Sequence, residues 1–303
     1  MKYLVIGAGG TGGSIAANMT QAGKDVTVIA RGSHLAAIQK SGLRMETSSK
    51  GNYTVFPVKA CDMEHYKERP DIIFVCVKSY SVEEIIPFIA GTAHKNTVVI
   101  PVLNVYGTGS RMQRQLPDML VTDGCIYVAA EIKAPGTILQ RGDIFRIVYG
   151  VRNQSEYRPV LEQVAFDLKD SKIEGIESDN IKRDAMQKFS FVSPMAACGA
   201  YYGITVGAAQ HTGKERNTFI SLMHEIASLA EAMGIHFAVD IVETNLKILD
   251  NLLPEASSSL QRDLKNGPKS EIDGLLFEVV RSGRKYGLSL PTYEMIARQF
   301  GFE

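Results

Sequence analysis

The segment KYLVIGAGGTGG, residues 2–13, indicates the fold of the N-terminal half. A short, β-rich apolar run, Lys2–Ile6, leads into glycines spaced as G-x-G-x-x-G and then into a predicted helix, Thr11–Ala22. In this pattern the first glycine permits a tight turn, the second lets a pyrophosphate approach the backbone, and the third lets helix and strand pack closely. The helix N-terminus then offers N–H groups to phosphates. The candidate phosphate-binding residues are Gly7, Ala8, Gly9, Gly10, Thr11 and Gly12, and the alternative is a glycine-rich turn without a ligand.

Further apolar runs follow and alternate with a helical stretch. We predict strands at Val26–Ala30, Asp71–Val77 and Thr97–Leu103, and a helix at Val82–Ala90. Strands that are apolar along their whole length are typical of a parallel sheet covered on both faces. Because strands and helices alternate, the N-terminal half is predicted to be a Rossmann-type, doubly wound sheet.

The pattern changes over residues 121–150, where short β-rich stretches are separated by turn residues such as Arg141-Gly142-Asp143. Such closely spaced strands favour hairpins, so we predict an antiparallel extension of the sheet. The predicted elements of this region are strands at Cys125–Ala130, Gly136–Gln140 and Ile144–Tyr149, a helix at Glu156–Leu168 and a short strand at Lys172–Ile176.

Beyond about Asp179 the sequence is helical to its end. Apolar residues recur at spacings of three and four over Phe219–Met233, which indicates an amphipathic helix, and another helix is predicted at Pro268–Tyr286. We therefore expect an α/β protein with two domains. Residues 1–177 would form a dinucleotide-binding domain with the antiparallel extension, and residues 178–303 an all-helical domain for substrate binding and dimerisation.

Composition and charge narrow the range of partners. The 303 residues include 33 lysines plus arginines and 33 aspartates plus glutamates, so the formal net charge is zero. A neutral chain gives no reason to expect nucleic acid or an anionic membrane as a partner, and no apolar run approaches the roughly 20 residues of a membrane helix. The cysteines lack CxxC spacing and the histidines are scattered, so we predict no metal site. With the first strand beginning at Lys2, we expect no signal peptide and a cytoplasmic location.

The residue after the second predicted strand indicates the cofactor. NAD-binding proteins usually place an acidic side chain there, which accepts a hydrogen bond from the ribose 2′-hydroxyl. Here Arg31 follows the strand, and residues 30–34 (ARGSH) contain no acid. An arginine pairs well with a 2′-phosphate through charge-assisted hydrogen bonds. NADP(H) is therefore the predicted cofactor, unless Arg31 is only a solvated surface residue.

Short motifs occur in a characteristic order along essentially the whole chain. They are the glycine motif, Arg31-Gly32 with His34, Val77-Lys78, Asn104, Lys188, the run SSSLQRD at residues 257–263 and the run SEIDG at residues 270–274. Together they resemble the ketopantoate reductase (2-dehydropantoate 2-reductase) family. The resemblance implies an enzyme that transfers hydride from NADPH to the 2-keto carbon of ketopantoate, giving pantoate on the route to pantothenate.

The resemblance also implies roles for single residues. Lys188 corresponds to the catalytic lysine, and Asn104 to the asparagine between cofactor and substrate. Lys78 corresponds to the lysine that lines the cofactor site. Ser258 and Glu271 correspond to a serine and a glutamate that contact the substrate, and Glu271 is also a candidate catalytic residue that accepts a substrate hydroxyl or tunes the lysine. The substrate is expected in a cleft between the domains, near these five residues.

Some positions depart from the pattern of that family. Val192 and Ala196 stand four and eight residues after the catalytic lysine, where the family has asparagines. Met186 and Glu255 stand where a tryptophan and an asparagine are common. Because the missing amides would contact the substrate, a related dehydrogenase for another small 2-keto acid, of the β-hydroxyacid or opine type, stays open, as does a non-catalytic NADP-binding sensor. The expected partner is a small-molecule 2-keto acid, and a homodimer is open as well.

Each candidate residue has two interpretations, a role in ketone reduction and a purely structural role. The protein must stabilise the developing alkoxide and deliver a proton, and a lysine ammonium can do both. Lys188 lies in an apolar stretch, where partial burial would lower a lysine pKa, but it could also be a surface lysine whose stem covers an apolar wall. Ser258 could be a loop serine or a donor to a substrate carboxylate. Glu271, after a candidate N-cap at Ser270, could also simply complement the helix dipole.

Overall fold

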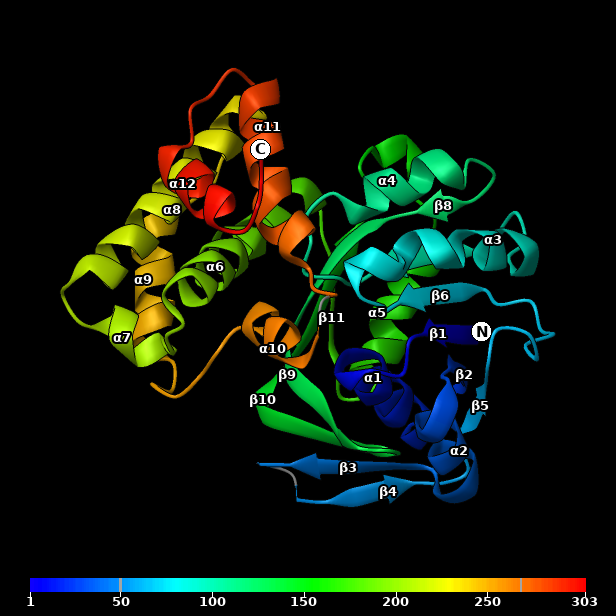
Figure 1. Ribbon diagram of the computed structural model, residues 1–303. Coiled ribbons are helices and arrows are strands. Elements are labelled where there is room, and N and C mark those ends of the chain that lie inside the picture. The colour runs from blue at the N-terminus through cyan, green and yellow to red at the C-terminus, as the bar shows by residue number, and fades with distance from the viewer. Residues whose placement is uncertain (49–50, 268) are drawn as a thin grey trace. The chain divides into compact units, whose positions relative to one another are not determined.

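The chain divides into two compact units in the computed structural model, which describes residues 1–48, 51–267 and 269–303 (Figure 1). The first unit comprises Met1–Leu103 and Gly107–Ile181, and the second comprises Asn104–Tyr106 and Lys182–Glu303. The division falls just after residue 181, whereas the sequence placed the boundary after residue 177. The short segment Asn104–Tyr106, which the sequence assigned to the first domain, belongs with the second unit.

A parallel sheet forms the core of the first unit, and its strands send alternate side chains to opposite faces. In β1, Tyr3 and Val5 enter one apolar cluster, whereas Leu4 and Ile6 enter the other. The prediction of a parallel sheet buried on both faces is thus confirmed. Among the described residues the strand order is β5 (Lys59–Cys61), β2 (Asp25–Ile29), β1 (Lys2–Ile6), β6 (Ile72–Val75), β7 (Val98–Pro101) and β8 (Leu120–Val121), with all neighbours parallel.

Helices cover both faces of this sheet. Buried side chains of α1, α2 and α5 join the cluster that contains Tyr3, and those of α3 and α4 join the cluster that contains Leu4. The helical elements of the first unit are α1 (Gly10–Gln21), α2 (Gly32–Ser41), α3 (Val82–Thr92), α4 (Thr108–Gln115) and α5 (Val160–Asp170), with short 3-10 turns η1 (Ser79–Ser81) and η2 (Gln154–Glu156).

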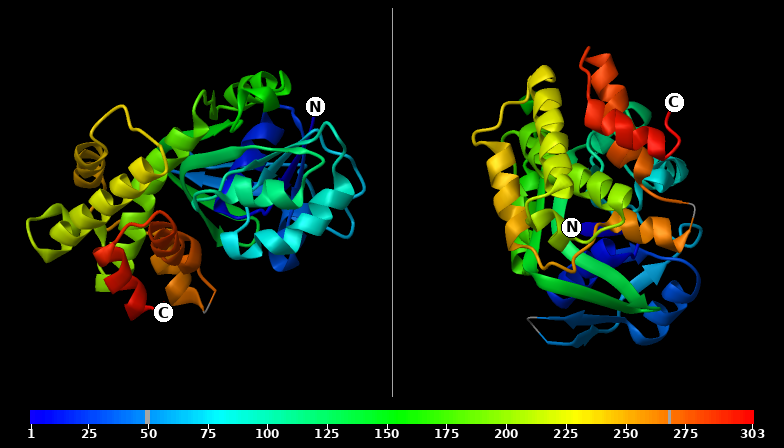
Figure 2. Two further views of the ribbon diagram at one scale, coloured as in Figure 1. Left: turned by 90° about the horizontal axis from the view of Figure 1, so that it is seen from above. Right: turned by 60° about the vertical axis from the view of Figure 1, so that its left-hand side comes forward.

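The predicted antiparallel strands are present, but they belong to a second, mixed sheet. Its long strands β9 and β10 form one hairpin, which Figure 2 shows in green, instead of the three short strands predicted from the sequence. The predicted turn at Arg141-Gly142-Asp143 is an irregularity inside β10, because pairing stops at Arg141 and resumes at Arg146. Two strands that were not predicted, β3 and β4, are short and partly polar. The described strands run in the order β11 (Glu174–Glu177), β10 (Thr137–Gly150), β3 (Leu43–Thr47) and β4 (Tyr53–Val55), and β9 (Asp123–Ala134) pairs with β10.

The second unit is helical, as predicted. The apolar residues of the periodic stretch, from Phe219 to Ala230, are buried in α8. The helix predicted at Pro268–Tyr286 differs: Pro268 lies outside the described residues, and helical structure begins at Ile272, with a π-helical turn at Asp273–Phe277. The other helices are α6 (Ile181–Tyr202), α7 (Val206–Gln210), α8 (Lys214–Ala232), α9 (Ile241–Asn251), α10 (Ser259–Asn266), α11 (Glu278–Lys285) and α12 (Pro291–Gln299).

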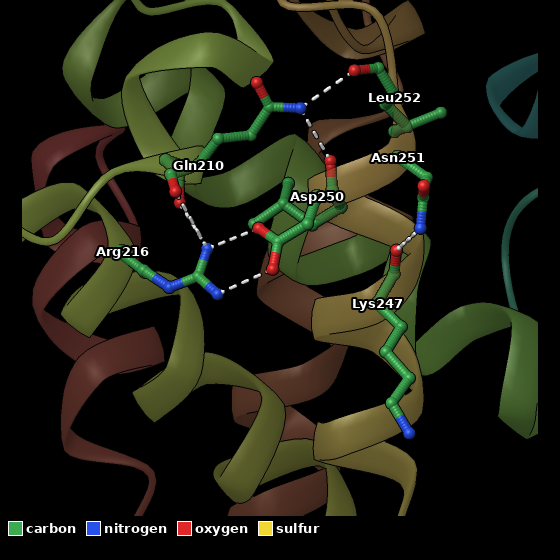
Figure 3. A network of polar contacts seen from close by, with 8 residues as sticks. Gln210, Arg216, Lys247, Asp250, Asn251 and Leu252 are labelled. Atoms are coloured by element: carbon green, nitrogen blue, oxygen red, sulfur yellow. Dashed lines mark hydrogen bonds and ion pairs between the residues drawn. The ribbon is translucent and has the colours of Figure 1, made fainter.

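A polar network joins three of these helices (Figure 3). Arg216 of α8 donates two hydrogen bonds to Asp250 of α9, at 2.6 and 2.9 Å. Its guanidinium holds the pKa of the Asp250 carboxyl below the ordinary value. Gln210 of α7 donates to the carbonyl oxygens of Leu249 and Leu252, at 2.9 and 2.8 Å. Since these bonds tie α7, α8 and α9 together, the network is structural.

Candidate active site

The glycine loop between β1 and α1 has the geometry of a phosphate cradle. Gly7 has a φ of 100°, which favours glycine, and a Cβ on Gly12 would lie only 2.0 Å from the carbonyl oxygen of Gly7. Gly9 is the N-cap of α1, and among the described residues no side chain caps that helix. A Cβ on Gly9 would meet none of the described atoms within 4 Å. Uncapped N–H groups beside open space suit an anionic group, so the loop fits the phosphates of a dinucleotide.

The β9–β10 hairpin packs closely on the same end of α1. A Cβ on Gly10 would lie 2.3 Å from the carbonyl oxygen of Ala130 in β9, and one on Gly13 would lie 2.9 Å from the side chain of Ile138 in β10. Gly10 and Gly13 therefore serve packing rather than the turn itself. The sequence could not show this, because it depends on where a hairpin more than 100 residues away comes to lie.

Alanine substitutions at Gly9 and Gly12 should separate cofactor binding from folding. We expect Gly9→Ala to keep the free energy of unfolding of the cofactor-free protein, because its methyl group enters open space. It should weaken NADPH binding about tenfold or more, as expected for one lost hydrogen bond to a charged group. Gly12→Ala should lower the free energy of unfolding by about 1–3 kcal/mol through overpacking. Urea unfolding and cofactor titration measure the two effects, and equal destabilisation by both variants would contradict the assignment.

The other candidate cofactor residues of the first unit lie at the same edge of the sheet. Strands β2, β1 and β6 are adjacent and parallel, so their carboxyl ends meet at one edge. Arg31 follows β2 as the N-cap of α2 and is exposed. Lys78 follows β6 as the N-cap of η1 and is half-buried. Ligands of open α/β sheets bind beyond the carboxyl ends of the strands, which is where the glycine loop, Arg31 and Lys78 are found.

In the second unit, Lys188 and Asn104 are in direct contact. The Nζ atom of Lys188, a half-buried residue of α6, donates a hydrogen bond of 3.1 Å to Oδ1 of Asn104. These two predicted residues are 84 positions apart in the sequence. The structure thus joins the ammonium of the candidate acid to an amide that directs one of its N–H groups.

The segment that carries Asn104 is held by close packing. Gly274, in the π-helical turn, lies against Val105, because a Cβ on this glycine would be 2.6 Å from the valine side chain. The ring of Tyr106 packs on that of Phe189 in α6, with 6.0 Å between ring centroids. π-Helical turns are rare in proteins, and those that occur are often found at functional sites. Gly274 and its π-helical turn were not recognised as site features from the sequence.

Glu271 lies two residues before this π-helical turn and is only 3% exposed. Its carbonyl oxygen accepts a hydrogen bond of 2.9 Å from the amide of Leu275. The sequence placed Glu271 inside a helix capped by Ser270, but the helix starts at Ile272, so Glu271 itself stands at the helix entrance. A buried carboxylate is costly without polar partners, which sets this glutamate apart from ordinary surface acids.

Ser258 has a structural role that was not predicted from the sequence. It is the N-cap of α10, and its hydroxyl accepts a hydrogen bond from the amide of Gln261 at 3.3 Å and donates to Gln261 Oε1 at 3.0 Å. Gln261 in turn donates to the carbonyl oxygens of Gly199 and Ile204. The capping-box pattern S-x-x-Q is present in the sequence at residues 258–261, but it lies within a run of three serines and was not recognised.

Replacing Ser258 separates its capping role from a substrate role. We expect Ser258→Ala to lower the free energy of unfolding by about 1 kcal/mol, the usual effect of removing an N-cap. The neighbouring Ser257→Ala is the matched control and should leave stability nearly unchanged. Chemical denaturation of the two variants measures the difference. An unchanged free energy of unfolding in Ser258→Ala would argue against the capping role, and a separate rise in the KM for a keto acid would indicate substrate contact.

The face of α6 that continues from Lys188 is apolar. Val192 and Ala196 follow at one and two turns, so they share a helix face with the lysine. Val192 is half-buried and Ala196 is 1% exposed. Met186, where the family often has a tryptophan, is buried in the core of the second unit. These positions offer no hydrogen-bonding groups beside Lys188.

Neither a metal-binding cluster nor a membrane-spanning helix is found in the described residues. In residues 1–48, 51–267 and 269–303, no group of three or more His, Cys, Asp and Glu side chains is placed to hold a metal ion. None of the helices in this described part of the chain is long and apolar enough to cross a membrane.

Comparison with known sequences identifies a family. The profile of "Ketopantoate reductase PanE/ApbA" matches residues 3–154, and that of "Ketopantoate reductase PanE/ApbA C terminal" matches residues 180–302. An uncharacterized oxidoreductase of Bacillus subtilis is 26% identical over 300 residues, which cover 98% of this chain and 96% of that protein. A 2-dehydropantoate 2-reductase of Mesorhizobium japonicum is 25% identical, with 98% of this chain and 95% of that protein covered.

Solved structures agree with this comparison. A 2-dehydropantoate 2-reductase from Porphyromonas gingivalis has a TM-score of 0.84 at 27% identity and covers 99% of both chains. A D-mandelate dehydrogenase with NADH and anilino(oxo)acetate has a TM-score of 0.87 at 20% identity, covering 98% of this chain and 96% of that one. A dimeric ketopantoate reductase from Staphylococcus aureus has a TM-score of 0.83 at 20% identity and covers 98% and 96%. The two profiles together span most of the sequence, and the chain therefore belongs to the ketopantoate reductase family of oxidoreductases.

Proposed function

We propose that this protein is an NADPH-dependent reductase of small 2-keto acids, with ketopantoate as the leading substrate and pantoate as its product. The observation that carries the proposal is the hydrogen bond of 3.1 Å from Lys188 Nζ to Asn104 Oδ1. It holds the ammonium of Lys188, a residue of α6, beside the side-chain amide of Asn104. Family membership supports the class of reaction, and the glycine loop supports a dinucleotide cofactor.

The residues of this chain can supply what ketone reduction needs from a protein. Bound NADPH would supply the hydride for the keto carbon. As negative charge develops on the keto oxygen, the ammonium of Lys188 stabilises it and then delivers the proton. Asn104 accepts one N–H of that ammonium and so restricts its rotation, which keeps another N–H directed for the proton transfer. In this mechanism Glu271 contacts the substrate, and Ser258 does so in addition to capping α10.

The choice of NADPH over NADH rests on the end of β2. Arg31 stands there, exposed, and residues 30–34 provide no carboxylate for a ribose 2′-hydroxyl. A guanidinium can pair with the 2′-phosphate of NADPH through two hydrogen bonds. The D-mandelate dehydrogenase of similar fold contains NADH, so the fold alone does not determine the cofactor.

Another small 2-keto acid, more apolar than ketopantoate, is the second candidate substrate. The observation that favours it is the apolar face of α6 beside Lys188, where Val192 and Ala196 cannot hydrogen-bond to the hydroxyl of ketopantoate. A site that binds a hydroxyl through hydrogen bonds strongly rejects analogues that lack it, whereas an apolar site does not. The two candidate substrates can therefore be distinguished by whether the enzyme requires the hydroxyl group of ketopantoate.

One comparison tests the proposed function. NADPH oxidation is followed with ketopantoate and with 3,3-dimethyl-2-oxobutanoate, which has a methyl group in place of the hydroxymethyl group, as well as with other 2-keto acids. A higher kcat/KM for ketopantoate supports the leading substrate, and a higher value for its methyl analogue supports the apolar candidate. Tight NADPH binding without reduction of any keto acid would contradict a reductase and favour a cofactor-binding sensor.

We also propose that the protein forms a homodimer. The support is the dimeric ketopantoate reductase from Staphylococcus aureus, whose fold this chain shares. Sedimentation of the purified protein should give twice the mass of one chain, and a monomeric mass at micromolar concentration would contradict the proposal.

A further inference from the structure

The imidazole of His34 connects two loops of the first unit. Its Nε2 lies 2.9 Å from the carbonyl oxygen of Ala8 in the glycine loop, and its Nδ1 lies 3.0 Å from the amide nitrogen of Gly136 at the β9–β10 turn. A backbone N–H can only donate, so Nδ1 is the acceptor and the ring proton resides on Nε2. His34 therefore accepts from Gly136 and donates to Ala8, a pattern that only the neutral ring can make.

The surroundings of His34 keep the ring neutral. Burial lowers the pKa of His34 below its ordinary value, and the hydrogen bond to Ala8 offsets this only in part. Along the sequence, the charged residues nearest to the two ends of this contact are Arg31, which precedes His34 at the start of α2, and Lys133, which precedes Gly136 in the hairpin. Neither side chain contributes to the lowering of the His34 pKa. The β9–β10 turn sits tightly on α2, because a Cβ on Gly136 would lie 3.0 Å from Cβ of Ala37.

The bond to Ala8 has a consequence for the phosphate cradle. A trans peptide is planar, and its C=O and N–H groups point in opposite directions. The carbonyl of Ala8 and the amide of Gly9 belong to one peptide, so holding the carbonyl toward His34 directs the Gly9 N–H away from it. Gly9 is the N-cap of α1 and the loop residue beside open space. The imidazole thereby sets the direction of a cradle N–H group.

We propose that His34 is a positioning residue of the cofactor site: it fixes the Ala8–Gly9 peptide in its phosphate-binding orientation and anchors that loop to the β9–β10 hairpin. The proposal rests on the dinucleotide site of the proposed function. It implies that protonation weakens cofactor binding, because a protonated Nδ1 would face the Gly136 N–H donor. Affinity is therefore constant at pH values above the lowered pKa of His34 in the cofactor-free protein, and it falls as the pH drops below that pKa.

Two substitutions test the proposal. Glutamine carries an amide with one acceptor and donors at about the spacing of the two ring nitrogens, but it does not titrate. Alanine removes both hydrogen bonds. We expect His34→Ala to raise the Kd for NADH about tenfold or more at pH 7.5, and His34→Gln to recover most of that loss.

Direct titration with NADH from pH 5.5 to 8 is the main measurement, because NADH lacks the 2′-phosphate whose own titration near pH 6 would interfere. The Kd of the unmodified protein should rise at acid pH, while that of His34→Gln should stay flat. Identical pH profiles for these two proteins, or an unchanged Kd in His34→Ala, would overturn the proposal. If the unmodified protein binds neither NADH nor NADPH, the proposed function fails as well, whereas binding that is indifferent to His34 removes this inference alone.

Discussion

Replacing Lys188 with alanine should reduce kcat by about 100- to 10,000-fold, the usual contribution of general acid catalysis. The Kd for NADPH should change little. The reason is that the ammonium acts on charge that appears on the keto oxygen only in the transition state, so its loss affects turnover more than binding. The hydrogen bond to Asn104 fixes the ammonium for this task, so Asn104→Ala should show a smaller loss of the same kind. Steady-state kinetics and cofactor titration measure the two quantities.

Two variants keep this test interpretable. Lys182→Ala removes an exposed lysine near the start of the same helix and should leave kcat unchanged. Lys188→Arg keeps a positive charge but is a much weaker proton donor, so its kcat should lie between those of the alanine variant and the unmodified protein. The best substrate from the keto-acid panel should be used, since Val192 and Ala196 give α6 an apolar face beside Lys188, which bears on the choice of substrate. Near-normal turnover of Lys188→Ala with that substrate would rule out Lys188 as the acid.

Replacing Arg31 with alanine should weaken NADPH binding by about 1.5–3 kcal/mol, the value of a hydrogen bond to a charged group. NADH binding should stay nearly the same, because NADH carries no 2′-phosphate. The effect should shrink as salt is added, since Arg31 is exposed and charges in water are screened. Lys40→Ala, an exposed cation in the same helix, is the matched control. Equal affinities of the unmodified protein for the two cofactors would contradict the proposed preference.

The sequence predicted the parallel sheet well because its signals are local. Continuous apolar strands such as Ile72–Val75, and glycines at fixed spacing, reflect physical needs that lie within a few residues of each other. The β9–β10 hairpin was misread because Gly142, with a φ of 68°, looks like a turn although the strand continues beyond it. Strands β3 and β4 were missed because short, half-exposed strands have weak apolar patterns.

The site was predicted less completely, because its parts meet only in three dimensions. The assignment of Asn104 to the second unit depends on the close approach of Gly274 to Val105, across about 170 residues of sequence. The capping role of Ser258 was visible in principle but competed with a reading as a substrate donor. The two contacts of His34 join segments 26 and 102 residues away, and no local pattern indicates them.

Isotope labelling tests directly whether the protein transfers hydride from NADPH to a keto carbon. The protein is incubated with NADPH that carries deuterium at both C4 positions and with the best 2-keto acid, and the product is examined by mass spectrometry. We predict a 2-hydroxy acid with one deuterium on C2, formed in the same amount as NADP is produced. An unlabelled hydroxy acid, or no hydroxy acid while the cofactor stays reduced, would contradict hydride transfer from NADPH to a keto acid.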